Sequence, residues 1–194
     1  MKSKGNNYIK FNYFFLIVFI LLYISVYSQI PPQRNPKYNT NINPKYNTQI
    51  NPLYNTLINP KYNTRINPLY NTQLNPKYNT LINPLYNTQL NPRYNTQLNP
   101  QYNLKINYKY SACSIYNLFR ENGDAIGFCV VVSSDFMLLY GNTYELEGYF
   151  IGAGYNFNMF YLDGNWSGSY LCSDDNYGYN LFDYQGNWIG NYLK

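Results

Sequence analysis

Two aspartates in the second half of the chain stand where carboxylates could do chemistry. Asp163 lies in the turn-like sequence LDGN, and Asp183 opens the sequence DYQGN one repeat further on. A pair of carboxylic acids is the catalytic apparatus of most glycoside hydrolases. Aspartates beside turns more often serve the turn itself, because their side chains bond to its backbone. A carboxylate-dependent glycan hydrolase is therefore kept only as an alternative.

The residue types that most other catalytic sites need are missing. The 194 residues include no histidine, which excludes Ser-His-Asp and Cys-His nucleophiles and the usual general base. Asp174, Asp175 and Asn176 before Gly178 are similar to a calcium loop, but the glycine comes too early and no glutamate closes the loop. We therefore predict no catalytic residue, no metal, no cofactor and no enzymatic activity.

Aromatic side chains offer a binding surface instead. Aromatic residues make up 20% of the chain, and their rings can stack on sugars or pack against peptides. The candidate ligand surface consists of Trp166, Trp188, Tyr177, Tyr179 and Tyr184. At least half of this set is expected to be core, which leaves the remainder to contact a glycan or a protein.

Basic residues are interleaved with tyrosines in the first half of the chain. No acidic residue precedes Glu121, whereas Lys194 is the single base after Arg120. The candidate polyanion contacts are Lys37, Lys45, Lys61, Arg65, Lys77 and Arg93. Leucines take the same place in alternate repeats, which argues against nucleic acid and favours an anionic polymer of the envelope. Docking of the acidic half onto these basic residues is a further alternative.

The N-terminus has the pattern of a secretion signal. Lys2, Lys4 and Lys10 precede the apolar run 14–27, and cleavage is expected just before Gln29. The alternative is an uncleaved anchor, because the apolar run approaches the length that spans a membrane. Either reading predicts an exported protein of the periplasm, the cell surface or the extracellular space.

Three cysteines follow this segment. In an oxidising compartment two of Cys113, Cys129 and Cys172 could pair, and an odd number leaves at least one over. The simpler interpretation is that they are small buried hydrophobic residues, with a Cys–Cys bond left open.

An octapeptide, N-P-x-Y-N-T-x-[IL], dominates residues 29–107. Eight copies begin at Asn35, Asn43, Asn51, Asn59, Asn67, Asn75, Asn83 and Asn91, and a ninth without its threonine begins at Asn99. A proline every eight residues forbids a continuous helix and pushes the preceding asparagine towards extended angles. An extended or disordered spacer is predicted, with an ordered array as the alternative. In an extended chain Pro, Tyr, Thr and Ile/Leu would share one face.

A second, longer repeat occupies the rest of the chain. NLFRENGDAIGFCV from Asn117, NMFYLDGNWSGSYL from Asn158 and NLFDYQGNWIGNYL from Asn180 align without a gap. LLYGNTYELEGYFI from Leu138 is a fainter copy, with Tyr144 in place of the turn glycine. Each unit reads as strand, tight turn, strand. The predicted centre of the shared core comprises Phe119, Tyr140, Phe160, Phe182, Ile126, Trp166 and Trp188.

These four F-x-x-x-G-x-x-x-G units resemble the bacterial family of 4-fold β flower proteins. The resemblance covers residues 116–194 and departs from the family pattern at Tyr144. It implies an all-β domain of four hairpins with pseudo-fourfold symmetry, and it implies no activity. The octapeptide resembles no family.

The sequence thus predicts three parts: a signal peptide at 1–28, an octapeptide spacer at 29–107 and a four-hairpin β domain at 108–194. The expected function is binding or structural, with the spacer presenting the β domain at the envelope or outside. A membrane contact is expected only through an uncleaved N-terminal segment.

Overall fold

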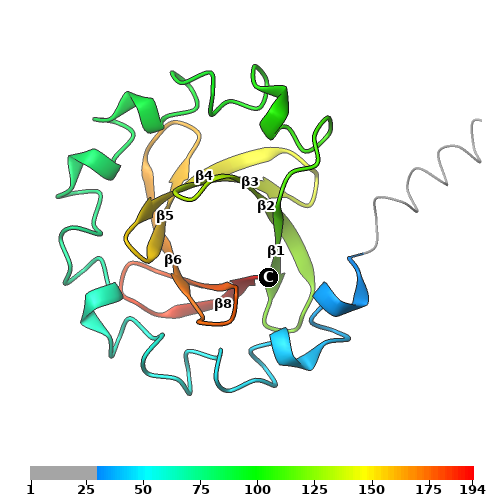
Figure 1. The fold of residues 1–194 in the computed structure, drawn as a ribbon. Coiled ribbons are helices and arrows are strands. Elements are labelled where there is room, and N and C mark those ends of the chain that lie inside the picture. The colour runs from blue at the N-terminus through cyan, green and yellow to red at the C-terminus, as the bar shows by residue number, and fades with distance from the viewer. Residues whose placement is uncertain (1–29) are drawn as a thin grey trace, which may run out of the picture.

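The computed structural model describes residues 30–194, and the predicted signal peptide lies outside this range (Figure 1). Residues 115–193 form a closed, antiparallel, eight-stranded barrel in which each strand pairs with its neighbours in the sequence and β1 pairs with β8. The strands are β1 (Ile115–Arg120), β2 (Ala125–Ser133), β3 (Phe136–Gly141), β4 (Leu146–Ala153), β5 (Asn156–Tyr161), β6 (Trp166–Ser173), β7 (Tyr179–Phe182) and β8 (Trp188–Leu193). The all-β prediction is confirmed.

Residues 30–110, which precede the barrel, contain six short 3-10 helices. They are η1 (Pro32–Arg34), η2 (Thr40–Ile42), η3 (Thr64–Ile66), η4 (Thr80–Ile82), η5 (Thr88–Leu90) and η6 (Leu104–Ile106). In the described part of the chain, no helix has both the length and the apolar character needed to cross a membrane.

Apolar side chains fill the inside of the barrel. The buried interior set is Leu118, Cys129, Met137, Leu139, Phe150, Phe157, Leu171, Leu181 and Leu193. Because successive side chains of a strand alternate between its two faces, Phe119 points outwards where Leu118 points inwards. The predicted burial of Phe119, Tyr140, Phe160 and Phe182 is confirmed, but they are buried on the outer face of the barrel and not at its centre. Of the predicted centre, Ile126 alone packs against the interior set.

The octapeptides cover that outer face. Residues 30–110, which we call the belt, run around the barrel as an outer ring (Figure 1). Ile82, Leu90 and Leu98 of the belt pack on a buried outer cluster that includes Tyr140 and Phe160. The prediction of an extended or disordered repeat region is wrong, because consecutive octapeptides form hydrogen-bonded turns and bury apolar surface on the barrel.

The belt meets the barrel at a fixed interval. A Cβ added to the turn glycine of three hairpins would lie near a belt asparagine: Gly123 near Asn43, Gly186 near Asn67 and Gly164 near Asn91. These asparagines are 24 residues apart, which is three octapeptides per hairpin. The belt therefore passes the first hairpin, then the fourth, then the third, against the chain order of the barrel.

Replacing Gly186 by alanine is expected to cost more stability than replacing Gly190. Both have a positive φ, 81° and 77°, so each alanine carries a similar backbone strain of about 1–2 kcal/mol. A Cβ at Gly186 would lie 2.9 Å from Nδ2 of Asn67, whereas one at Gly190 meets nothing within 4 Å. Displacing the buried Asn67 amide adds about 1–3 kcal/mol.

Urea unfolding of Gly186→Ala and Gly190→Ala measures this difference. Equal losses in the free energy of unfolding would show that the belt does not press on the hairpin turn.

Candidate binding surface on the belt

Each octapeptide is built from two turns that its asparagines close. In the copy that starts at Asn75, the side-chain Oδ1 of Asn75 accepts from the Lys77 amide at 2.9 Å. The Asn75 carbonyl accepts from the Asn79 amide at 2.8 Å. Asn79 then repeats the first contact, because its Oδ1 accepts from the Leu81 amide at 3.1 Å. Asparagine favours such turns, and proline suits the position that follows it.

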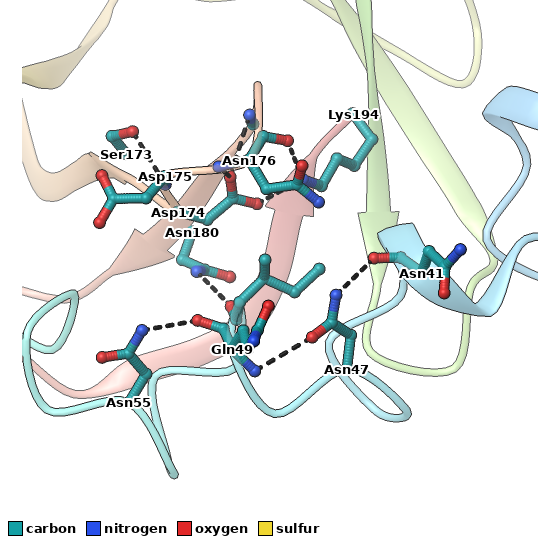
Figure 2. A network of polar contacts seen from close by, with 12 residues as sticks. Asn41, Asn47, Gln49, Asn55, Ser173, Asp174, Asp175, Asn176, Asn180 and Lys194 are labelled. Atoms are coloured by element: carbon teal, nitrogen blue, oxygen red, sulfur yellow. Dashed lines mark hydrogen bonds and ion pairs between the residues drawn. The ribbon is translucent and has the colours of Figure 1, made fainter.

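The same asparagines also bind each octapeptide to the one before it. Nδ2 of Asn75 donates to the Pro68 carbonyl at 2.9 Å, and Nδ2 of Asn79 donates to the Gln73 carbonyl at 2.7 Å. Figure 2 shows two further rungs of the second kind, from Asn47 and Asn55. The side-chain amides therefore supply a ladder of hydrogen bonds in a segment where proline removes backbone donors.

This construction decides which residues face the barrel. The Ile/Leu, Asn and Pro at each junction are buried or half-buried, whereas Tyr and Thr are exposed. The expected grouping of Pro, Tyr, Thr and Ile/Leu on one face is wrong, because that grouping assumed the two-residue period of an extended chain. In this belt the period is eight.

A row of exposed tyrosines follows from this arrangement. One tyrosine per repeat points away from the barrel, with 60% (Tyr46) to 74% (Tyr38) of its surface accessible. The row comprises Tyr38, Tyr46, Tyr54, Tyr62, Tyr70, Tyr78, Tyr86, Tyr94, Tyr102 and Tyr110. Because Tyr normally buries much of its ring, ten exposed copies at a constant interval form a surface suited to a ligand. We call this row the tyrosine rim.

The predicted polyanion contacts also belong to the belt. Lys37, Lys45, Lys61, Arg65, Lys77 and Arg93 are all exposed. Lys37 forms an ion pair with Asp124 at 2.5 Å, which raises the lysine pKa. Within residues 30–194 the other five form no ion pair, although Lys77 lies over the Tyr184 ring. Five of the six basic side chains thus carry a charge that no acidic residue of the described range pairs with.

The predicted aromatic surface is not a single surface. The Trp166 and Tyr184 rings meet edge to face with centroids 5.5 Å apart. Trp188 packs, as Ile66 of the belt does, against the buried cluster of Tyr170, Cys172 and Phe182. Tyr179 packs against the interior of the barrel instead. Tyr177 is 93% exposed in the β6–β7 connection. Only Trp166 and Tyr184 come together as a pair.

The two candidate catalytic aspartates serve separate turns. Asp163 lies between β5 and β6 and bonds to Asn165, while Asp183 lies between β7 and β8 and bonds to Asn187. The hydrogen bonds from Asn165 hold the pKa of Asp163 below its usual value. A general acid needs the opposite shift, so this arrangement suits a turn and not proton donation.

In the loop that is similar to a calcium site, Asp174 pairs with a lysine. Asp174 is fully buried, its Oδ1 accepts from the amides of Asn176 and Gly178, and its Oδ2 lies 2.6 Å from Lys194 Nζ (Figure 2). Burial lowers the Lys194 pKa against the attraction of Asp174. Within the described range, no group of three His, Cys, Asp or Glu residues could hold a metal ion.

The three cysteines lie in three different clusters. Cys129 is buried inside the barrel, Cys172 lies under the belt near Ile66, and Cys113 packs at the end of the belt. All three are free thiols in this structure. Burial raises the pKa of the Cys129 and Cys172 thiols, as expected for inert packing residues.

Three buried asparagines on the outer face of the barrel anchor the belt. Nδ2 of Asn156 donates to the Ile66 carbonyl, and Nδ2 of Asn158 donates to the Leu74 carbonyl at 2.8 Å. Asn180 donates to the Ile50 carbonyl at 2.9 Å (Figure 2). Sequence reasoning missed this role. The sequence signal that could have revealed a cover on the barrel is the nearly continuous apolar run FMLLYG of β3. Such a run indicates a strand that is buried on both faces, and β3 is buried throughout.

No protein-family model matches the chain, and no match was found among curated proteins or solved structures.

Proposed function

We propose that this chain is an exported, non-catalytic protein whose tyrosine rim binds an acidic polysaccharide of the cell envelope or its surroundings. The observation that carries the proposal is the row of ten exposed tyrosines on a belt with nine basic and no acidic residues. Tyrosine supplies an apolar ring face and a polar tip, which together suit a sugar ring and its hydroxyl groups.

The rigidity of the belt supports multivalent binding. Each tyrosine stands on a turn whose backbone the asparagine ladder and the barrel fix, so little backbone conformational entropy is lost when a ligand binds. A polymer that contacts one tyrosine meets the next at a high effective concentration. Weak single contacts can therefore sum to useful affinity.

The spacing of the charges favours an acidic glycan over nucleic acid. Lys45, Lys61 and Lys77 alternate with Leu53 and Leu69 in the variable slot that precedes each tyrosine. From Lys45 to Arg93, a basic residue thus returns in this slot only every second octapeptide. Duplex DNA carries about one charge per 1.7 Å, a density that such a slot does not match.

We also propose that the barrel consists of four equivalent hairpins, as in the 4-fold β flower proteins that its sequence resembles. Four stacked aromatic pairs between neighbouring hairpins support this: Phe119–Tyr192, Phe128–Tyr140, Tyr149–Phe160 and Tyr170–Phe182. Tyr144 adopts φ 62°, so the odd hairpin keeps the backbone conformation of its glycine-bearing counterparts.

Replacing three neighbouring rim tyrosines by serine is expected to weaken binding of a soluble acidic polysaccharide, such as polygalacturonate, by about tenfold. The triple variant is Tyr54→Ser, Tyr62→Ser and Tyr70→Ser, and Tyr155→Ser is the control because it removes an exposed tyrosine outside the belt. Calorimetry at two salt concentrations measures affinity and its electrostatic share, with neutral dextran as the uncharged comparison.

Binding that survives the triple substitution would contradict the role of the rim. Equal binding of duplex DNA and polygalacturonate would identify general polyanion binding instead.

A further inference from the structure

A cavity of about 420 Å³ lies where the two ends of the belt approach each other on the outer face of the barrel. Pro31 borders it from the start of the belt and Tyr108 from its end, while Asn117, Gly127 and Phe128 line it from β1 and β2. Its lining is mainly apolar, with a few polar side chains among aromatic ones. Ligand sites commonly have this size and composition.

Asn117 occupies the position in its hairpin at which the asparagines of two other hairpins bind the belt. It stands two residues before Phe119, as Asn158 and Asn180 stand two residues before their own phenylalanines. Asn158 donates to the Leu74 carbonyl and Asn180 to the Ile50 carbonyl. Within residues 30–194, the side-chain amide of Asn117 bonds to no carbonyl.

The belt segments bound by Asn158 and Asn180 show which kind of peptide this position binds. Ile50 and Leu74 are each followed by Asn-Pro, and their side chains are 2% and 9% exposed against the barrel. The ligand in both cases is a peptide carbonyl on an apolar residue that leads into an Asn-Pro turn. At the cavity, Phe128 offers the apolar surface and Asn117 the amide for the same pair of contacts.

We propose that this cavity is a docking site for a segment of a partner polypeptide, in which Ile or Leu precedes an Asn-Pro turn. The segment continues the interface between belt and barrel across the gap between the belt's ends. The Asn117 amide donates to the carbonyl of the Ile or Leu, and the apolar side chain packs on Phe128. This site is distinct from the tyrosine rim and does not depend on the proposed glycan binding.

A fluorescently labelled octapeptide of this chain, INPKYNTQ, tests the site by anisotropy against the full chain. Saturable binding is expected, and Asn117→Ala should weaken it about fivefold or more, since a buried carbonyl would lose its donor. Asn41→Ala is the matched control, because Asn41 is an exposed asparagine of the belt. A peptide with the order IPNKYNTQ should bind no better than the Asn117→Ala variant binds the first.

Absence of saturation at millimolar peptide would overturn the proposal, as would binding that Asn117→Ala leaves unchanged. Binding that begins only after residues 1–28 are removed from the folded protein by an engineered protease site would also overturn it. That result would assign the cavity to the chain's own preceding segment.

Discussion

Raising the pH above about 10 is expected to unfold the protein steeply. Tyr149, Tyr170 and Tyr192 are completely buried between barrel and belt, and this burial raises the pKa of each phenol. Burial also raises the pKa of Tyr140, to about 12. The unfolded chain releases these protons near pH 10, whereas the folded chain retains them.

The sign of the effect follows from these raised pKa values. The stabilising contribution of each neutral tyrosine is complete below about pH 10 and is lost as the pH rises through the folded-state pKa. Each group contributes about 1.4 kcal/mol per pH unit, so four groups lose roughly 5 kcal/mol per unit. The buried thiols of Cys129 and Cys172 act in the same direction, and the lowered pKa of Lys194 opposes them as a single group.

Urea unfolding at a series of alkaline pH values measures the slope, and tyrosinate absorbance reports when the buried phenols ionise. Tyr192→Phe should make the dependence shallower by one group, whereas Tyr62→Phe, on the exposed rim, should leave it unchanged. A stability that stays flat through this pH range would show that the phenols are accessible to water in the folded protein.

Replacing Lys194 by methionine is expected to cost about 3–5 kcal/mol of unfolding free energy. The ammonium group lies 2.6 Å from the Asp174 carboxylate, and their side chains are 4% and 0% exposed. Removing the lysine leaves a buried carboxylate whose charge only the amides of Asn176 and Gly178 offset. Lys194 also donates to the Asn176 carbonyl at 2.7 Å, so the β6–β7 connection loses two contacts.

The double variant Asp174→Asn with Lys194→Met separates charge from packing. It should recover most of the loss, because a neutral amide needs no counter-charge. Lys61→Met, at an exposed belt position without an ion pair, should leave stability unchanged. A double variant as unstable as Lys194→Met would show that the lysine acts through packing alone. Denaturant midpoints of the three variants against the parent provide the measurement.

The strands and turns of the barrel could be predicted because their signals are local. Gly123, Gly164 and Gly186 mark three hairpins, and each adopts the positive φ that a tight turn requires. The repeat length also placed Tyr144 at the turn of the remaining hairpin, where φ is 62°. What could not be read locally was which strand face is the inside, because both faces of β3 are apolar.

The belt could not be predicted because the hydrogen bonds that order it are made by asparagine side chains. Helices and sheets are recognised from patterns of backbone hydrogen bonds, and this segment has no such pattern. Proline at every eighth place argued against regular structure, and that argument holds for backbone ladders alone. Nδ2 of Asn43, for example, donates to the Pro36 carbonyl seven residues earlier. The side chain thus supplies a hydrogen-bond donor in a segment where proline lacks a backbone N–H. The candidate site followed the same division. The basic residues of the belt were visible in the sequence, whereas the exposure of the rim tyrosines was not.

Local residue types are enough to predict four hairpin turns, a repeating Asn-Pro turn and a basic segment that precedes an acidic one. The closure of the second repeat into a barrel, and the path of the first repeat around it, are visible only in the folded chain. Neither could be read locally, because the belt and the barrel bury their apolar surfaces against each other. Three octapeptides span one hairpin, so Asn158 and Asn180 donate to belt carbonyls that are 24 residues apart. This match between the two repeats exists only when the belt lies on the closed barrel.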